Sequence, residues 1–444
     1  MKAVQTIKNI WKIEDLRTRI LTTVFLVILY RLGTYVVLPG IDPNALLALK
    51  NSTSEGLLAL LDMFSGGAFS NASIFALGIM PYISASIVMQ LLAIVIPSVQ
   101  KMQREGESGR RKINQYTRYL TILILLVQGP VYLIGTRNTL AAEGVIMPSS
   151  LGFMAVSTAI LIAGSMFVLW LGEKITDKGI GNGVSFIILI GIIARFPEAI
   201  INEFSLRLGG EGGLYVFILE IIFLLLVIAG AILLVQGTRR VPVQYAKRMI
   251  GNKQYGGARQ YIPLKVNAAN VMPIIFAQAI MFLPVSLYSF ASNEPSAVLA
   301  DFMHGRGVLY AALFSFLIIL FTYFYTAVTV NPTQMAEDLK RNNGFIPGVK
   351  PGKATKNFLD DVMSKITLPG AIFLAIVAIL PTFAMSDSMG INPAFAQFFG
   401  GTSLIILVGV VLDTLQQIES HLLMHHYDGF SESGRIKGRS SAMY

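Results

Sequence analysis

The chain has 444 residues, of which 54% are hydrophobic and only 14% charged, and its formal net charge is +10. The apolar residues occur in long unbroken runs, which excludes a soluble domain with an ordinary core. Basic loops beside an anionic membrane surface are usual in polytopic membrane proteins, so the positive charge alone does not indicate nucleic-acid binding. The chain has no cysteine, which excludes disulfides and thiolate metal sites.

Ten apolar stretches follow one another along the chain, and each is close to the roughly 20 residues that a helix needs to cross the hydrocarbon core. They lie at about 20–38, 74–97, 119–136, 153–172, 183–201, 214–236, 271–291, 308–330, 368–386 and 402–420. The first stretch is too long for a signal peptide, and no small-residue cleavage pattern follows it. The sequence therefore predicts an all-α membrane protein with ten transmembrane helices.

The basic residues alternate between the connections of these helices. Of the 35 Lys and Arg residues, 29 lie in the N-terminal segment, the even-numbered loops and the C-terminal segment, and six lie on the other side, counting Arg31. Lys and Arg are retained in the cytoplasm during membrane insertion. This pattern predicts a multi-pass protein with both termini in the cytoplasm.

The long loop 237–270 divides the ten helices into two sets of five. An odd number of helices per half gives the halves opposite orientations, and inverted repeats of this kind place their functional site where the halves meet. We expect an N-terminal half at 1–201, helix 6 with the basic loop at 202–270, helices 7–10 at 271–420 and a cytoplasmic tail at 421–444.

Two short motifs each occur once in both halves, at equivalent helices. They are Met80-Pro81-Tyr82-Ile83 and Met272-Pro273-Ile274-Ile275 in helices 2 and 7, and Gly183-Val184-Ser185-Phe186-Ile187-Ile188 and Gly401-Thr402-Ser403-Leu404-Ile405-Ile406 in helices 5 and 10. A Pro near a helix start costs little, and Gly and Ser let helices approach closely. Helix packing alone would therefore explain either motif.

The repetition also supports a sharper interpretation, in which helices 2, 5, 7 and 10 are central and their motifs face one another. The residues that would meet are Ile83, Ile188, Ile275 and Ile406. Ile79 lies one turn from Ile83 and Val184 one turn from Ile188, so both extend the same helix faces. We expect a collar of aliphatic side chains and not a polar substrate site.

A small segment rich in Gly and Ser precedes the second helix. It consists of Asp62, Met63, Phe64, Ser65, Gly66, Gly67, Ala68, Phe69, Ser70, Asn71, Ala72 and Ser73. The segment is apolar enough to enter the bilayer, but glycine interrupts it, and irregular backbone at membrane depth persists only where it is buried in protein or lines an aqueous cavity. Composition alone equally allows an external loop.

Two of the predicted cytoplasmic loops are long and basic. Loop 237–270 contains seven basic residues and no acidic one, and loop 331–367 adds six basic residues with two Pro-Gly pairs around Lys350. Long ordered loops tend to be functional, so we expect an acidic partner here, with contact to lipid headgroups as the alternative. The candidate docking residues are Arg239, Arg240, Lys247, Arg248, Lys340, Arg341 and Lys350.

The sequence contains neither a Walker-type phosphate loop nor a His-Glu-x-x-His motif. His421 and His425 have the i, i+4 spacing of a metal site, but they lie in a polar tail where solvated histidines are common. Arg31, Glu220 and Asp413 could mark a polar pathway, with snorkelling or a packing pair as the simpler role. We therefore expect no enzyme activity, no cofactor and no metal.

Seven runs in order along essentially the whole chain carry a resemblance to a known family. They are FSGGA at 64–68, ALGIMPYISASI at 76–87, EGESGRRK at 105–112, GIGNG at 179–183, YAKR at 245–248, PLKVN at 263–267 and FFGGTS at 398–403. With these runs the chain closely resembles the SecY family, the channel subunits of the bacterial protein translocase.

The resemblance implies a protein-conducting channel in which the two halves form a clam shell around an hourglass-shaped pore. Its pore ring would consist of Ile79, Ile83, Val184, Ile188, Ile275 and Ile406. Segment 62–73 would be the plug, and helices 2 and 3 would part from helices 7 and 8 as a lateral gate. The channel would pass unfolded secretory polypeptides across the bacterial plasma (inner) membrane and release transmembrane segments sideways into lipid.

The resemblance also implies partners. The basic loops would bind the ATPase SecA or the translating ribosome, SecE would clamp the halves from outside, and SecG would be a further subunit, while signal sequences, nascent polypeptides and membrane lipids would meet the helices. Two positions depart from the family pattern. Lys350 replaces the usual Arg and loses its planar fork, which bears on coupling to SecA, and Val184 replaces the more usual Ile, which implies a slightly wider collar.

Two other classes of protein compete with a channel. A secondary transporter would also have inverted repeats, but it needs polar or ionisable residues at the midplane ends of broken helices, whereas the repeated motifs here end in Ile. A passive scaffold or an insertase without a pore would not need a segment such as 62–73.

Overall fold

A computed structural model describes residues 13–42, 46, 49–50, 56–142, 145, 147–148, 150–209, 213–245, 248–250, 253–255, 259–269, 271–291, 307–385 and 390–432. Each of the ten predicted stretches coincides with a helix. These helices are α2 (Glu14–Gly33), α5 (Met80–Val95), α7 (Glu107–Ala142), α8 (Leu151–Lys178), α9 (Gly183–Leu208), α10 (Gly213–Gln236), α11 (Met272–Ala291), α13 (Val308–Thr329), α15 (Lys353–Ala384) and α17 (Gly401–Glu432). The prediction of ten transmembrane helices is confirmed.

Seven of these helices, α7, α8, α9, α10, α13, α15 and α17, are long and apolar enough by themselves to cross a membrane, among the described residues. A further span results if α5 and α6 (Pro97–Arg104), which meet at a bend of 108°, are counted as one. On α10, Leu219, Leu226 and Leu233 lie at seven-residue intervals and are 61%, 66% and 73% exposed. A stripe of exposed leucines suits a lipid-facing surface, and the chain is a multi-pass membrane protein.

Several helix ends differ from the hydropathy prediction. α7 and α15 begin 12 and 15 residues earlier than predicted, and α17 ends 12 residues later, inside the predicted tail 421–444. The extensions of α7 and α15 are rich in charged residues, and that of α17 contains three histidines, so hydropathy does not detect them although their backbone is helical. Conversely, α5 begins only at Met80, because residues 74–79 form turns beside the β-bridge between Val37 and Ser73.

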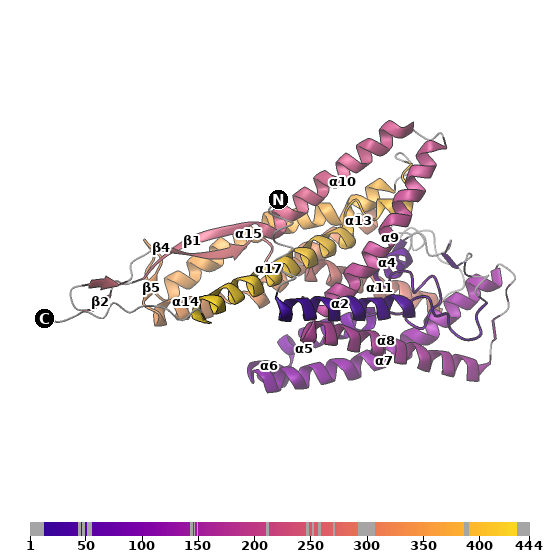
Figure 1. Ribbon diagram of the computed structural model, residues 1–444, viewed down its shortest axis with the longest axis horizontal. Coiled ribbons are helices and arrows are strands. Elements are labelled where there is room, and N and C mark those ends of the chain that lie inside the picture. The colour runs from indigo at the N-terminus through magenta and orange to yellow at the C-terminus, as the bar shows by residue number, and fades with distance from the viewer. Residues whose placement is uncertain are drawn as a thin grey trace.

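The two halves gather on opposite sides of the molecule. α2, α5, α7 and α8 lie together along one side, and α10, α13, α15 and α17 lie along the other (Figure 1). Across the interface each central helix contacts its counterpart, since α5 contacts α11 and α9 contacts α17. Contact between equivalent helices is what a pseudo-twofold relation between inverted halves requires.

The two basic loops fold together into a small unit that the sequence does not predict. Antiparallel strands β1 (Thr238–Tyr245) and β4 (Arg259–Lys265) pair from Thr238↔Lys265 to Gln244↔Arg259, and β5 (Gly344–Phe345) extends the sheet in the order β4-β1-β5. A second pair, β2 (Arg248–Ile250) and β3 (Lys253–Tyr255), lies beyond it. The strands extend away from the helix bundle at the left of Figure 1.

Alternation along β1 gives the sheet a buried face. Val241 and Val243 are buried with Leu264 of β4, and they pack in one cluster with Leu339 of α14 (Pro332–Arg341) and Leu359 of α15. Arg240 and Pro242, the neighbours of Val241 along β1, are exposed, as period-two alternation requires. We call this assembly of β1, β4, β5, α14 and the first turns of α15 the loop unit.

Candidate functional site

The repeated motifs coincide with helix starts. α5 and α11 begin at Met80 and Met272, so that Ile83 and Ile275 are the fourth residues of their helices. α9 and α17 begin at Gly183 and Gly401, so that Ile188 and Ile406 are the sixth residues of theirs. Each isoleucine therefore occupies the same helical position as its counterpart in the other half.

The predicted ring residues lie together in one apolar cluster. Ile79, Ile83, Ile188 and Ile406 are buried members of it, and Val184 and Ile275 pack against it. Because four helices from both halves contribute, the cluster lies where the halves meet, on the α5–α11 and α9–α17 contacts. That it forms the constriction of a pore stays a prediction.

The Gly-rich segment 62–73 is buried beside this cluster. It begins in the last turn of α4 (Gly56–Phe64) and continues through turns, and Met63, Phe64 and Ala68 belong to the same apolar cluster as the ring residues. Ala68, Ser70, Ala72 and Ser73 are fully buried. Burial of this kind does not suit a freely exposed external loop and meets the condition for irregular backbone at membrane depth.

Two consecutive glycines let the segment turn against charged side chains. Gly66 and Gly67 have φ values of +66° and +89°, in the left-handed region that favours glycine. A Cβ at Gly66 would lie 2.6 Å from Nη1 of Arg31, and one at Gly67 would lie 3.1 Å from Nη2 of Arg195. The double glycine therefore provides both the turn and the space for two guanidinium groups.

The segment is attached to three helices of the N-terminal half. The Tyr30 hydroxyl on α2 donates to the Ser65 carbonyl at 2.9 Å, and Nη1 of Arg31 donates to the Gly66 carbonyl at 2.7 Å. The Tyr132 hydroxyl on α7 donates to the Phe69 carbonyl at 2.8 Å. On α9, the Arg195 guanidinium pairs with the Asp62 carboxylate and donates to Oγ of Ser70 at 2.7 Å.

The contacts of Arg31 and Glu220 agree with the packing role that the sequence offered for them. Arg31 holds the Gly-rich segment, and Glu220 on α10 accepts from Nη2 of Arg207 on α9 at 2.6 Å. The Nε of Arg207 also lies 2.8 Å from Oε1 of Glu203, whose other carboxylate oxygen accepts from the Asn392 backbone N–H at 2.8 Å. This buried cluster links α9 of the first half to α10 and the start of α16 (Pro393–Ala396) in the second.

The predicted docking residues lie on the loop unit where they are described. Arg239, Arg240, Lys340, Arg341 and Lys350 are exposed. Arg248 opens β2, and its side chain lies outside the described residues, as does Lys247 altogether. Loops 237–270 and 331–367 thus place their described docking residues on one structural unit, although Arg240 and Lys340 are 100 positions apart in the sequence.

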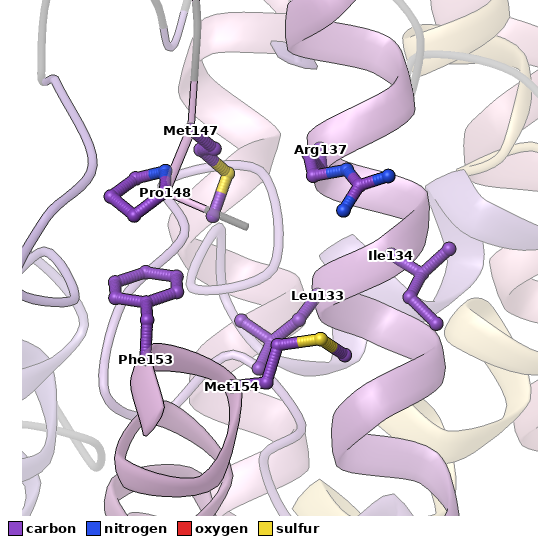
Figure 2. A pocket seen from close by; sticks show the side chains of 7 residues that line it. All are labelled: Leu133, Ile134, Arg137, Met147, Pro148, Phe153 and Met154. Carbon is purple, nitrogen blue, oxygen red and sulfur yellow. The ribbon is translucent and has the colours of Figure 1, made fainter. Parts of the chain in front are cut away.

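A small pocket lies away from the ring, between the end of α7 and the start of α8. Figure 2 shows its lining, which is apolar except for one guanidinium: Leu133, Ile134, Arg137, Met147, Pro148, Phe153 and Met154. None of the residues predicted for the ring, the Gly-rich segment or the docking surface lines this pocket.

The sequence interpretation missed Arg195. A signal was present, because an arginine inside the predicted span 183–201 is costly in a membrane unless it has a partner. Arg207 and Glu203 lie beyond that predicted span and within the actual helix α9, so the same reasoning did not reach them.

The fold is that of a ten-helix membrane protein, built from two inverted halves with an apolar cluster at their interface and a buried segment beside it. The SecY family model matches residues 73–415. The protein translocase subunit SecY of Thermotoga maritima is 42% identical over 447 aligned residues, covering 98% of this chain and 99% of that one. That of Pseudomonas aeruginosa is 40% identical, covering 97% and 96%. The chain belongs to the SecY family.

Solved structures share the fold at lower identity. One described as a protein-conducting channel has a TM-score of 0.60 and 17% identity, with 91% of this chain and 92% of that chain covered. Sec61 in a canine ribosome–channel complex from the endoplasmic reticulum has a TM-score of 0.57 and 16% identity, with the same coverage. These likenesses bear on the fold alone.

Proposed function

We propose that this chain is the channel subunit of a protein translocase, which conducts unfolded secretory polypeptides across the bacterial inner membrane. The observation that carries the proposal is the apolar cluster at the interface of the halves, to which the starts of four equivalent helices contribute. Residues Ile79, Ile83, Val184, Ile188, Ile275 and Ile406 would form its pore ring. The chain has no catalytic task in this account, and the energy comes from a partner.

An aliphatic ring suits this work for two physical reasons. A translocating polypeptide presents every kind of side chain, so the constriction must fit around it without specific hydrogen bonds. A narrow hydrophobic constriction also resists ion flow by dewetting when the channel is at rest. A secondary transporter would place polar groups at these helix ends, and the aliphatic character of the four isoleucines favours the channel.

The buried segment 62–73 acts in this proposal as the plug. Its contacts to α2, α7 and α9 keep it with the N-terminal half. Signal sequences and transmembrane segments would leave sideways where α5 and α7 part from α11 and α13, and the contact between α5 and α11 closes that path in the resting channel.

The loop unit acts as the docking surface for the driving partner. Its exposed residues Arg239, Arg240, Lys340, Arg341 and Lys350 suit an acidic surface such as the translating ribosome or SecA. A ribosome-bound relative, the canine Sec61 complex, has the same fold. SecE and SecG would join as small subunits against the exposed helix faces, and both termini would lie in the cytoplasm, on the side of the loop unit.

Disulfide cross-linking to an arrested substrate tests the proposal. The chain has no native cysteine, so a single cysteine at Ile188 reports without background. A substrate with one cysteine, arrested during translocation, should cross-link to Ile188→Cys. It should not cross-link to the matched control Leu226→Cys on α10, where the native Leu226 is 66% exposed. Equal cross-linking at both positions, or none at Ile188, would exclude passage through the ring.

A further inference from the structure

The guanidinium of Arg195 contacts the plug segment at two places, its first residue, Asp62, and Ser70. It pairs with the Asp62 carboxylate, and its Nη2 donates to Oγ of Ser70 at 2.7 Å. The backbone N–H of Ser70 also donates to Oδ1 of Asp62 at 2.8 Å. The side chains of Arg195 and Asp62 are only 22% and 10% exposed. One cation therefore joins Asp62 and Ser70, eight residues apart in the segment, at a site that is largely shielded from water.

The segment is also bonded internally, so that it can move as one body. The Gly67 N–H donates to the Asp62 carbonyl at 2.8 Å, and the Ser73 N–H donates to the Ala68 carbonyl at 3.1 Å. Oγ of Ser65 donates to the Asp62 carbonyl at 3.0 Å. Its position against the helices is then set by its external contacts. Those from α2 and α7 go to main-chain carbonyls, whereas Arg195 binds side chains.

Arg195 lies on the same face of α9 as a ring residue. Ile188, Gly191 and Arg195 are spaced i, i+3 and i+7, which places them in one stripe along the helix. Ile188 belongs to the apolar cluster, and a Cβ at Gly191 would lie 2.7 Å from the Phe64 carbonyl oxygen. Helix α9 thus carries a ring residue, a glycine against which the plug backbone packs, and the arginine that pairs with Asp62.

We propose that Arg195 is a positioning residue that latches the plug against α9 in the resting channel, and that this contact breaks when the plug leaves. The inference rests on the proposed function, because it takes residues 62–73 as the plug. Hydrogen bonds to charged groups are stronger than neutral ones, and a partly buried carboxylate that loses its cation is costly. Removal of the guanidinium should therefore shift the plug toward the displaced state by roughly ten- to a hundredfold.

Resting ion conductance of the full chain, reconstituted in planar bilayers with its copurified subunits, tests the latch. Arg195→Gln should raise the resting conductance at least about tenfold by the same estimate. Arg195→Lys keeps the charge and should retain most of the seal. Arg118→Gln is the matched control, because Arg118 also binds a carboxylate across two helices, with Nη2 at 2.6 Å and 2.7 Å from the Glu173 oxygens, away from the plug.

Thiol labelling gives a second measurement that does not depend on conductance. A cysteine at half-buried Asn71 reports the position of the plug, and a cysteine at fully buried Ala371 on α15 reports the integrity of the fold. Combined with Arg195→Gln, the cysteine at Asn71 should react several-fold faster while the cysteine at Ala371 stays protected. Reaction at both sites would mean loss of the fold. In that case the Arg195→Lys variant is measured with the same two cysteines, and its labelling rates at positions 71 and 371 decide whether the proposal holds.

Deletion of residues 65–70 separates failure of the latch from failure of the plug. If the deletion raises conductance but Arg195→Gln changes neither conductance nor labelling, the proposed role of Arg195 is wrong, and the assignment of residues 62–73 as the plug is retained. If the deletion leaves conductance unchanged, the segment is not a plug and the latch falls with it. Equal increases for Arg195→Gln and Arg118→Gln would also overturn the specific role of Arg195.

Discussion

Replacing Arg207 should destabilise the protein far more than replacing an exposed arginine. The Arg207 side chain is 4% exposed, and its partners Glu203 and Glu220 are 0% and 7% exposed. Arg207→Met leaves two buried carboxylates facing each other without their cation. Breaking a buried ion pair by removing one partner costs about 3–5 kcal/mol. For a chain of this size, the thermal midpoint should fall by on the order of 5 °C.

We attribute the large fall in thermal midpoint to the burial of the Arg207 cluster. The Arg118–Glu173 pair is the control for this cause, because it differs in exposure. That pair is equally well formed, but its side chains are 44% and 32% exposed. Exposed pairs contribute at most about 1 kcal/mol, so Arg118→Met should shift the midpoint only slightly. Retention on size exclusion after heating in detergent measures both midpoints.

A triple variant tests the physical reason for the loss. Replacing Arg207 with Met together with Glu203→Gln and Glu220→Gln removes the uncompensated charge and should recover a large part of the lost stability. If Arg207→Met melts like the parent, the buried cluster does not hold the two halves together. If the triple variant melts no higher than Arg207→Met, uncompensated charge is not the cause of the loss.

Three further predictions follow from single contacts. Gly191→Ala should raise resting conductance several-fold, because its Cβ would lie 2.7 Å from the Phe64 carbonyl oxygen, whereas Gly135→Ala on α7, with open space around it, should match the parent. Reversing Arg239, Arg240, Lys340 and Arg341 to Glu should weaken ribosome or SecA binding most at low salt, which a salt series measures against Arg111→Glu; unchanged binding with retained topology would remove the docking role. Gln417→Ala should loosen the loop before α9, because the Gln417 side chain accepts from the Gly181 N–H at 2.9 Å, and faster proteolysis near residue 180 would report it.

The central helices α5, α9, α11 and α17 could be predicted because their local sequence motifs lie at the residues where these helices begin, next to the interface of the halves. The Met-Pro and Gly-x-Ser motifs open α5, α11, α9 and α17 at the residues where these helices begin. Pro suits the first turn of a helix, and glycine permits the close approach of neighbours: a Cβ at Gly183 would lie 1.9 Å from the Gly172 carbonyl oxygen of α8. Repetition of the motifs then identified the interface.

What could not be predicted depends on contacts between distant residues. Arg195 and Asp62 are 133 residues apart, and no local pattern connects them. In the loop unit, β5 joins the sheet by pairing with β1, which lies in the other loop. The late start of α5 depends on the bridge between Val37 and Ser73. In each case tertiary contacts determine the structure, whereas a hydropathy average includes only residues that are adjacent in the sequence.

In the proposed function, the aliphatic cluster at the interface of the halves seals the resting channel. The most direct test is the resting ion conductance of a variant in which Ile83, Ile188, Ile275 and Ile406 are all replaced by Ser. A matched variant with Leu at the same four positions keeps the cluster apolar. We predict that the Ser variant leaks ions and that the Leu variant does not, because a polar constriction admits water where an aliphatic one dewets. A Ser variant as tight as the parent, with its fold intact, would contradict it.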